Sequence, residues 1–464
     1  MAGLFQGLEI GRRALLTHQL NLQTIGHNIA NVNTPGYSRQ RVNITSTMPD
    51  HLTTGIVGTG VKAVDIRNIK DLFLGEQYRQ ENKSLGEWTY KEKVLSQIEN
   101  LFNEPNDDTL SQLMTDFWSS WSDLATGVEG ARENIVSQAN KLTNGFHEIA
   151  NQLNNLRDSI DRDLSNYTNQ INNLTGEIAR LNHLIKSQEV GNEHANDLRD
   201  QREILLDDLS ALVDVNNREN ADGTMTVYIG AMTIVSDTKS LDIESVVKNE
   251  DGKVTHNLVW EGSNVVLKSA KGQLKGLLDT RDKMIPKYIG ELDRLAGTIV
   301  SEVNALHSTG YGANDSTDVN FFDPDKVRAI DIQLDSEIVF DSAKIAGSME
   351  LGKRDDNRIA LEIANLQNKT MLNNGTATMD YYYNSMVSSL GIEVSESKSF
   401  KSNYELLVEQ INYSKESIQG VSLDEEMTNM VKFQQAYDAA ARVITTMDQA
   451  LDTVISGMGV VGRY

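Results

Sequence analysis

The sequence contains no cysteine and has little proline and few aromatic residues. Among its 464 residues are 5 prolines, and aromatic side chains make up 6%. Without cysteine there are no disulfide bonds, no thiol catalysis and no zinc–thiolate site. Because proline in a helix interior removes a hydrogen bond and clashes with the preceding turn, its scarcity leaves long stretches free to form helix. This composition favours a chain dominated by long helices.

Long apolar runs and an excess of positive charge are missing as well. No run of 18 or more apolar residues occurs, so no segment is expected to span a membrane. The first five residues lack the charged-then-apolar layout of a cleavable signal. The net charge of −23 argues against nucleic acid or an anionic membrane surface as the main partner. A chain of this length is expected to form about three domains.

Side chains that could carry catalysis or hold a metal are dispersed along the chain. No two of the 8 histidines have the three- or four-residue spacing of a helical metal site. No phosphate-binding glycine loop and no nucleophile elbow occurs. Residues 214–225 weakly resemble a calcium loop, but Met225 stands where such a loop needs glutamate. We therefore expect no catalytic residues, no cofactor and no metal, and a protein that is not an enzyme.

The first 45 residues have the pattern of one amphipathic helix followed by a sharp turn. The stronger apolar row recurs at every seventh position: Leu8, Leu15, Leu22 and Ile29. A second row is weaker, because two of its five members are not apolar: Leu4, Gly11, His18, Ile25 and Val32. Alternating steps of three and four residues place such rows together on one face of a helix. We predict an interface there that includes the stronger row and Ile25.

The chain repeats this pattern between about Asp424 and Met458. One row consists of Met430, Tyr437, Ile444, Leu451 and Met458, and the other of Phe433, Ala440, Met447, Val454 and Val461. Residues 1–70 hold 7 Lys and Arg against 3 Asp and Glu, whereas residues 418–464 hold 3 against 6. Matching seams and opposite charge favour pairing of the two ends. The alternative is that the two helices dock separately on one core.

A helix stop and a tight turn follow the N-terminal helix. The asparagines between positions 28 and 33 suit a helix end, because asparagine tolerates the left-handed conformation. In Thr34–Tyr37 proline stands second and glycine third, which suits a type II turn. The alternating residues 41–45 then indicate a short strand. As structure alone, a generic loop would serve equally well.

As a spelled-out string, this turn resembles the signature of the bacterial flagellar axial proteins, the family of rod, hook and hook-associated proteins. The signature is carried by Asn31, Asn33, Thr34, Pro35, Gly36 and Tyr37, and its continuation Ser38, Arg39 and Gln40 is similar to the hook-associated protein 1 family. Residues 423–444, 276–282 and 302–311 resemble that family too. Because these matches lie at the beginning, two-thirds along and at the end, the resemblance spans the chain.

The clearest periodicity in the sequence lies between Leu142 and Ile185. Apolar residues follow alternating steps of four and three over six heptads, with one interruption at Asp163. The pattern predicts a coiled-coil-like helix about 65 Å long. Asp163 could set the register or leave a solvated gap in the seam, and we favour the gap.

Further helices are expected to complete a helical rod. A helix over 71–102 should break at Pro105, and Asp108 or Thr109 can cap the next one. The aromatic stripe that follows, with Phe117 and Trp121, is expected to be core. A polar corner is expected at Gly191. The remaining helical segments are 198–212, 272–306, 357–368 and 400–419.

Between positions 214 and 272 the sequence changes to short segments rich in β-branched and aromatic residues. These segments are 225–229, 233–235, 258–260 and 265–267. Asp222-Gly223 and Asp251-Gly252 punctuate them as hairpin turns would, which predicts a small β domain. The strand-like patches 330–334 and 338–340 could belong to this domain or be separate.

The predicted fold class is mainly α. It combines long coiled-coil-like helices from paired N- and C-terminal arms, a helical bundle rod and a small inserted β domain. The expected domains are residues 1–68 plus 420–464 for the arms, as an inner-tube domain, 69–213 plus 273–419 for the rod, and 214–272 for the β domain.

The resemblance implies a structural function. A member of the hook-associated protein 1 family would connect the flagellar hook to the filament and assemble through its terminal helices. Its implied partners are the flagellar hook protein, hook-associated protein 3, further copies of itself in a helical ring, and an export chaperone on the C-terminal arm. It would be secreted by the flagellum's own export apparatus and lie outside the cell, at the hook–filament junction.

Two alternatives stay open at this point. A hook subunit or a distal rod protein would share the terminal arms, but the six-heptad helix and Ser38–Gln40 disfavour this reading. An enzyme or binding module with coiled-coil ends would need a clustered polar site, which the sequence does not display.

Overall fold

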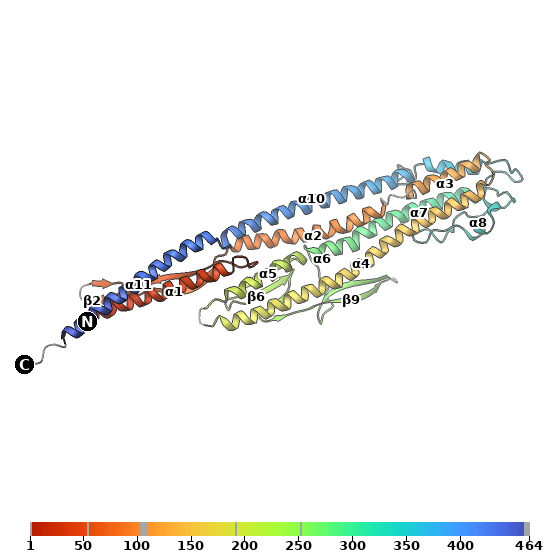
Figure 1. The fold of residues 1–464 in the computed structure, drawn as a ribbon. Coiled ribbons are helices and arrows are strands. Elements are labelled where there is room, and N and C mark those ends of the chain that lie inside the picture. Colours follow the sequence, from red (N-terminus) through yellow and green to blue (C-terminus); the bar gives the residue numbers. More distant parts are fainter. Residues whose placement is uncertain (1, 53–54, 103–108, 191–192, 251–252, 459–464) are drawn as a thin grey trace, which may run out of the picture.

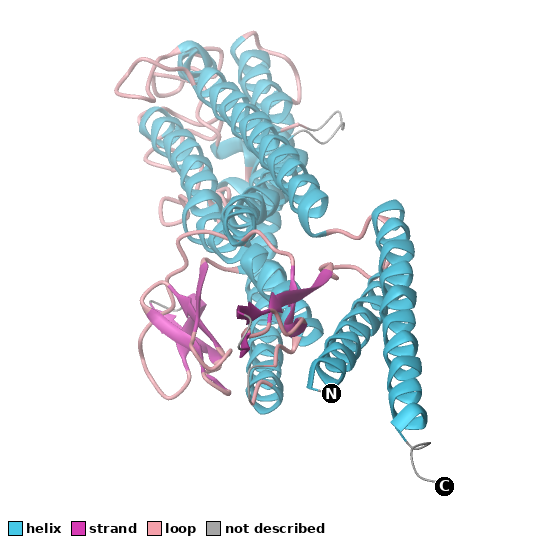
Figure 2. Ribbon diagram, turned by 90° about the vertical axis from the view of Figure 1, so that its left-hand side faces the viewer, coloured by secondary structure: helices cyan, strands magenta, loops and turns pink. Residues whose placement is uncertain are grey.

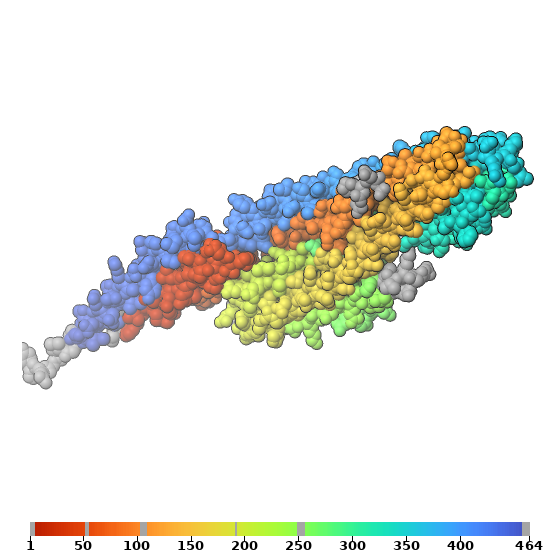
Figure 3. All heavy atoms as spheres, turned by 45° about the vertical axis from the view of Figure 1, so that its right-hand side comes forward, coloured from red at the N-terminus to blue at the C-terminus, as the bar shows by residue number. Residues whose placement is uncertain are grey.

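Long helices run along most of the molecule, and small β-sheets are attached to them. The computed structural model describes residues 2–52, 55–102, 109–190, 193–250 and 253–458. Over these residues the chain is mainly helical with a small β portion, which confirms the predicted fold class. Figure 1 shows an elongated molecule with the first and the last helix together at one end. In Figure 3 this pair forms a narrow extension of the thicker rod.

The two ends of the chain form what we call the arms. Their elements are α1 (Ala2–Ala30), β1 (Gln40–Ser46), β2 (Asp50–Leu52), β3 (Gly55–Val57), β4 (Val61–Asn68) and α11 (Leu423–Met458). β1 pairs antiparallel with β4, and β2 with β3. α1 packs along α11, so the predicted pairing of the two ends is confirmed.

The other helices form the rod. They are α2 (Leu72–Phe102), α3 (Leu110–Ala125), α4 (Ala131–Gln188), α5 (Asn196–Leu212), α6 (Gln273–Asp279), the π-helical turn η1 (Thr280–Met284), α7 (Ile285–His307), α8 (Ser336–Phe340), α9 (Arg358–Asn365) and α10 (Met379–Gln419), with 3-10 turns at η2 (Ser342–Lys344) and η3 (Leu366–Asn368). α10 packs along α2, while α4 packs against α3, α5 and α7. Figure 1 shows α10, α2, α7 and α4 in successive layers along the rod.

Six strands lie on the side of the rod formed by α4. They are β5 (Val215–Glu219), β6 (Met225–Ile229), β7 (Met232–Ser236), β8 (Lys239–Ser240), β9 (Ile243–Glu250) and β10 (Lys253–Trp260). β5 to β8 form an antiparallel four-stranded sheet in sequence order, and β9 pairs with β10. Figure 2 shows these strands gathered at one side of the helices. The predicted turn at Asp222-Gly223 joins β5 to β6, with Gly223 at a φ of 80°.

The apolar seam of α4 explains its length. The helix has 58 residues, about 87 Å at 1.5 Å per residue, which exceeds the prediction. It begins earlier because Ile135 and Ala139, both buried, continue the seam toward the N-terminus. Asp163 is more than a solvated gap, since its Oδ2 accepts a hydrogen bond from the Tyr90 hydroxyl at 3.0 Å. The next residue, Leu164, occupies the buried position instead.

The aromatic stripe of α3 is core, as predicted. Thr109 caps the helix by accepting a hydrogen bond from the backbone N–H of Gln112, at 3.4 Å. Phe117 and Trp121 are fully buried, and the Trp121 ring lies 5.2 Å from that of Phe321, centroid to centroid. This cluster belongs to a continuous core that extends along α2, α4 and α7. Burial of such large rings supplies much of the hydrophobic stabilisation of a rod.

His307 lies at the edge of this cluster and ties two loop segments to α7. Its Nδ1 donates to the carbonyl oxygen of Val319 at 2.7 Å, and its Nε2 accepts from the backbone N–H of Ala346 at 2.9 Å. Only a neutral imidazole makes both bonds. Burial lowers the pKa of His307 to about 4, against the smaller opposing effects of its bond to Val319 and of Asp335.

Two strand predictions are wrong. Residues 330–334 form no strand, only one bridge between Phe322 and Leu334, and residues 338–340 belong to the short helix α8. Their apolar side chains reflect packing on the core, because Ile332, Leu334 and Ile338 are buried. Residues 265–267 likewise contribute a single bridge, from Val266 to Val259.

Several predicted positions lie outside the described part of the chain. They are Pro105, Asp108, Gly191, Asp251-Gly252 and Val461, together with the side chains of Leu4 and Met458.

Candidate assembly interface

The arms pack as an antiparallel helix pair with small residues at the contact. A Cβ added to Gly7 would lie 2.9 Å from Met447 Cε, and one added to Gly11 would lie 2.8 Å from Ile444 Cγ1. At Gly7 an added side chain would meet only the flexible side chain of Met447, whereas at Gly11 it would crowd Ile444 close to the α11 backbone. Further along, the rings of His18 and Phe433 lie 6.0 Å apart, centroid to centroid. Burial lowers the pKa of His18.

The weaker of the two predicted rows on α1 makes these contacts. Gly11 and His18 face α11, and Ile25 on the same row is buried. The stronger row lies beside it and is half-buried: Leu8, Leu15, Leu22 and Ile29. On α11 the predicted residues with described side chains are half-buried as well: Met430, Tyr437, Ile444 and Leu451. The pair therefore covers only part of its apolar rows.

Large apolar side chains also remain on the outer faces of the arms. The exposed ones on the two helices are Phe5, Leu16, Leu423, Met427, Val431, Val443 and Ile455. Exposed apolar surface of this extent marks interaction sites on soluble proteins. The assembly role of the predicted interface residues stays a prediction at this point.

One buried asparagine joins α1, the signature turn, β1 and α11. The Asn28 Nδ2 donates to the carbonyl oxygen of Gln40 at 3.0 Å and to Glu426 Oε2 at 2.9 Å. Its Oδ1 accepts from the Tyr37 hydroxyl at 2.8 Å and from the backbone N–H of Gln40 at 3.0 Å. Both donors and both acceptor positions of the amide are used, at a residue only 1% exposed. A fully satisfied buried polar group fixes geometry more strictly than apolar contact does.

The signature turn has the predicted geometry and rests on the rod. The backbone N–H of Tyr37 donates to the carbonyl oxygen of Thr34 at 3.2 Å, and Gly36 has a φ of 72°. Gly36 also approaches Ile204 of α5 so closely that an added Cβ would lie 2.4 Å from Ile204 Cδ1. Burial, followed by the charges of Asp197 and Asp200, raises the pKa of Tyr37. Pro35 and its neighbours Asn33 and Thr34 are exposed, and Asn31 is half-buried.

Asp200 of α5 binds both segments that connect the N-terminal arm to the rod. Its Oδ2 accepts from the backbone N–H of Ser38 at 2.8 Å. Its Oδ1 accepts from Asn68 Nδ2 at 2.6 Å and pairs with Lys70 Nζ at 2.7 Å. Burial raises the pKa of Asp200, although Lys70 and the Ser38 N–H act in the opposite direction. Both N-terminal connections thus converge on one carboxylate of the rod.

The C-terminal connection is anchored at the same joint. The backbone N–H of Arg39 donates to the carbonyl oxygen of Gln419 at 2.7 Å, and the Arg39 guanidinium pairs with Glu425. Residues 420–422 alone separate α10 from α11. A cavity of 620 Å³ lies at this joint, between residues 31–38 and the rod.

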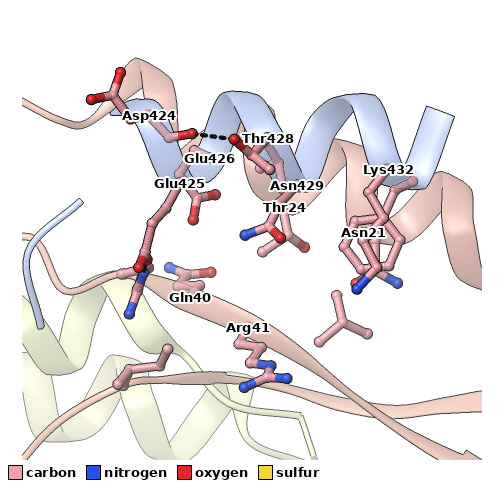
Figure 4. Close-up of a pocket in the computed structure, with 15 residues that line it drawn as sticks. Asn21, Thr24, Gln40, Arg41, Asp424, Glu425, Glu426, Thr428, Asn429 and Lys432 are labelled. Atoms are coloured by element: carbon pink, nitrogen blue, oxygen red, sulfur yellow. Dashed lines mark hydrogen bonds and ion pairs between the residues drawn. The ribbon is translucent and has the colours of Figure 1, made fainter. Parts of the chain in front are cut away.

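A second cavity, of 580 Å³, lies within the arms (Figure 4). Asn21 and Thr24 of α1 line it, together with Arg41 of β1 and Asp424 and Lys432 of α11. Its walls carry both charge signs and no histidine. In the described part of the chain, no group of three or more His, Cys, Asp or Glu side chains could hold a metal ion.

Two acidic residues of the segment that weakly resembles a calcium loop, Asp214 and Asp222, form ion pairs with lysines. Lys83 Nζ pairs with Asp214 at 2.9 Å, and Lys186 Nζ pairs with Asp222 at 3.0 Å. Among the helices described, none is both long and apolar enough to cross a membrane.

Sequence reasoning missed the polar part of this site. Asn28 had been read only as a helix-end residue, while Glu426 and Asp200 were not predicted to matter. Gly7 was not singled out either. Spacing reveals apolar rows, but a hydrogen bond between positions 28 and 426 leaves no periodic signal. The Asn28-to-Tyr37 string was the one available hint.

Three family models match the chain. "Flagellar hook-associated protein FlgK helical domain" matches residues 95–322. "Flagella basal body rod protein" matches residues 8–37, and "Flagellar basal body rod FlgEFG protein C-terminal" matches residues 417–457. The two shorter matches coincide with α1 plus the signature turn and with α11.

Relatives of known identity match over the full length. Flagellar hook-associated protein 1 of Bacillus subtilis is 34% identical over 511 residues, covering 100% of both chains. This chain belongs to the flagellar hook-associated protein 1 family. Members from Salmonella typhimurium and Escherichia coli are 24% and 23% identical, each over 94% of this chain and 97% of the relative. The family consists of structural flagellar proteins, which associate with other hook and filament components.

A solved structure agrees with the fold. The flagellar hook junction protein FlgK from Burkholderia pseudomallei superposes with a TM-score of 0.66 at 15% identity, over 75% of this chain and 100% of that one. Because the identity is only 15%, this likeness shows a shared fold and nothing more.

Proposed function

We propose that this chain is a structural junction protein that connects the flagellar hook to the filament. The family membership supports this role, because the similar proteins carry the name hook-associated protein 1 and the similar structure is a hook junction protein. The single observation that carries the mechanism is the incomplete burial of the arms. Their apolar rows are half-covered within one chain, so neighbouring subunits would complete them.

In this mechanism the arms form an inner tube and the rod projects outward. Each antiparallel α1–α11 pair would bury Leu8, Leu15, Leu22 and Ile29 against neighbours in a helical, heterologous array. Residues 1–68 with 420–464 would make the inner-tube domain, 69–213 with 273–419 the rod, and 214–272 the β domain. The polar joint at Asn28 and Asp200 would hold the rod at a fixed angle to the arms.

The proposed partners follow from a position between two different assemblies. The flagellar hook protein would contact the arms on one side and hook-associated protein 3 on the other, with further copies of this chain beside it. An export chaperone would cover the C-terminal arm before secretion, because the exposed side chains of Met427 and Val431 need shielding from water. The protein would leave the cell through the flagellar export apparatus and act without catalysis.

Immunogold labelling of intact flagella with an antibody against residues 214–272 tests this proposal. We expect a single narrow band between hook and filament. Label along the whole hook would favour the alternative, a hook subunit, and label confined to the region below the hook would favour a distal rod protein. Absence of label from flagella, with the protein found elsewhere in the cell, would overturn both.

A further inference from the structure

The part of the rod next to the joint turns its positive charges inward. Residues 70–92 and 399–422 contain six lysines and arginines, all of them buried or half-buried and paired with carboxylates: Lys70, Arg79, Lys83, Lys91, Lys401 and Lys415. Four glutamates of the same two segments are exposed: Glu76, Glu405, Glu409 and Glu416. Within these two segments no cation is exposed, so the outer surface that they form is acidic.

Three of these glutamates form what we call the acidic row of α10: Glu405, Glu409 and Glu416. Steps of four and seven residues place them on one face of the helix. Glu416 accepts a hydrogen bond from Asn412 Nδ2 at 3.2 Å, and in the described part of the chain no ion pair involves any of the three. The nearest exposed cation on α10, Lys398, lies two turns before Glu405. Glu405 and Glu409 are like charges one turn apart, which destabilises a helix, and the isolated chain leaves this repulsion uncompensated.

The ribbon formed by β1 and β4 has the opposite arrangement. Its three exposed cations, Arg41, Lys62 and Arg67, make up what we call the basic face. In the antiparallel register Arg41 lies opposite Arg67, and the β-bulge after Asn43 brings Lys62 onto the same face. The acid of the ribbon is covered instead, because the Asp65 side chain is only 4% exposed. This cationic surface contrasts with the net charge of −23 for the whole chain.

The basic face contains a repulsion of its own. Like charges directly opposite each other on paired strands destabilise a sheet, and this is the position of Arg41 and Arg67. Arg67 Nε lies 2.7 Å from Asp65 Oδ2, but the Arg67 side chain is still 60% exposed. Among the described residues, no ion pair involves Arg41 or Lys62. The ribbon therefore carries more positive charge than its own chain neutralises.

We propose that the basic face of one copy packs against the acidic row of the next copy. This inference rests on the proposed function, in which copies of the chain assemble around a common axis. Contact between the two surfaces would compensate the repulsion within each of them. Their lengths agree as well. The row spans about 16 Å from Glu405 to Glu416 at 1.5 Å per residue. The basic face spans about 13 Å, which is the length of the four steps between residues 41 and 45 at about 3.3 Å each.

A second copy is the occupant that satisfies both surfaces at once. A basic partner would cover only the acidic row, and an acidic partner would cover only the basic face. Within the described part of one chain no ion pair joins the two surfaces, because the ribbon runs along the arms and α10 along the rod (Figure 1). The next copy must therefore be shifted along the long axis. Two different surfaces form a heterologous contact, and repeating it with such a shift generates a helical array.

Charge exchange tests the contact and identifies the occupant. Glu405→Lys with Glu409→Lys reverses the acidic row, and Arg41→Glu with Lys62→Glu reverses the basic face. Each double variant brings like charges together, so we expect its incorporation into flagella, measured by immunoblot, to fall at least about tenfold. The fourfold variant carries both reversals in every copy. Its incorporation should return close to that of the unaltered chain.

The controls for this experiment separate assembly from folding. Glu148→Lys with Asp158→Lys, at two exposed acids of α4, adds the same charge and should be incorporated normally. The monomers should unfold at unchanged temperature, because the reversed side chains are exposed and no ion pair is lost. Normal incorporation of both reversed double variants would overturn the inference. Failure of the fourfold variant to recover would assign the two surfaces to other proteins and would overturn it as well.

Zero-length cross-linking tests the same contact in the unaltered chain. A carbodiimide joins a lysine amine to a carboxylate that touches it, and Lys62 is the only lysine of the ribbon. In isolated flagella we expect multimers of this chain in which Lys62 is joined to a glutamate of the acidic row, and none from the dilute monomer. Lys62→Arg keeps the charge but removes the amine, so this variant should be incorporated normally without the cross-link.

Two outcomes distinguish this inference from the proposed function. One is that Lys62 is joined to a different protein, or to no copy of this chain, in flagella where gold label places the chain at the junction. This result would overturn the inference and leave the proposed function standing. Absence of the chain from the junction would overturn both.

Discussion

The arms and the rod are both built from long helices, but they bury their side chains to very different degrees. In the rod, Phe117, Trp121 and most residues of the α4 seam are buried within one chain. In the arms, Ile25 and Ala440 are buried, while the predicted rows are half-covered. Glycine contacts and one polar cluster hold the arms, whereas ring-on-ring packing holds the rod. The core of the rod is therefore complete within one chain, whereas the arms leave their apolar rows half-covered.

The largest expected effect separates assembly from folding. Leu15→Asp or Ile444→Asp places a charge in the apolar surface of the arms, so we expect incorporation into flagella to be abolished while the rod stays folded. Electron microscopy of flagella measures incorporation, and circular dichroism of the purified monomer measures folding. Normal flagella from either variant would contradict the role of the arm pairing. Gln19→Asp, at an exposed position of α1, is the control for the added charge.

The next largest effect should appear in the rod alone. Trp121→Ala removes a fully buried ring from the aromatic cluster and should lower the free energy of unfolding by about 3–5 kcal/mol. Denaturant unfolding of the purified monomer measures the loss. A change below about 1 kcal/mol would mean that the rod, like the arms, depends on neighbours for its stability.

The pH dependence of the rod should come in part from His307. Because burial lowers its pKa from 6.5 to about 4, the unfolded chain takes up a proton first as the pH falls. The stability that neutral His307 supports is complete above pH 6.5 and is lost between pH 6.5 and about 4, by roughly 3 kcal/mol in total. His307→Asn should flatten the unfolding free energy between pH 5 and 7, where most carboxyl groups stay ionised. An unchanged slope in the variant would assign the dependence to other groups.

A smaller and local effect is expected at the joint. Asn28→Ala leaves the Tyr37 hydroxyl and the Glu426 carboxylate without their amide partner, which should cost about 1–3 kcal/mol. Hydrogen exchange should accelerate at the backbone N–H of Gln40, which loses its acceptor, and stay slow in α4. Asn33→Ala, at an exposed position of the same turn, is the control. Equal acceleration in both variants would indicate general loosening of the turn.

The smallest effect should come from a salt bridge on the arm surface. Arg12 and Arg13 hold the pKa of Glu9 down at about 2, but all three side chains are solvated. Exposed pairs of this kind add little stability because water screens them. Glu9→Gln should leave both thermal unfolding and incorporation unchanged. A defect in incorporation alone would show that Glu9 faces a neighbouring subunit.

The sequence allowed most of the fold to be predicted, because periodicity reports burial directly. The α4 seam, the aromatic stripe of α3 and the heptads of α11 all had clear spacing, and the structure contains each of these helices. The errors at 330–340 have a physical origin. Apolar residues that cover a core from a loop have the same composition as a strand, and only the tertiary context distinguishes them.

The candidate site was predictable only in its apolar half. Glycine at position 11 looked like a weakness in the seam, yet α11 lies so close there that an added Cβ would be 2.8 Å from Ile444 Cγ1. The bonds of Asn28 to Glu426 and of Ser38 to Asp200 link positions 398 and 162 residues apart. Such pairs depend on how the whole chain folds, and no spacing pattern in a single sequence indicates them.

The separation between the two arm helices also has a consequence in time. α1 is the first helix to leave a ribosome or any channel that passes the chain N-terminus first, and α11 is the last. Closing a loop of nearly the whole chain is slow compared with forming local contacts. The rod helices can therefore pack together before α11 is available to pair with α1. The arms would become able to assemble only when α11 has emerged. Antiparallel pairing of α1 with α11 would therefore restrict assembly to chains that have emerged as far as α11.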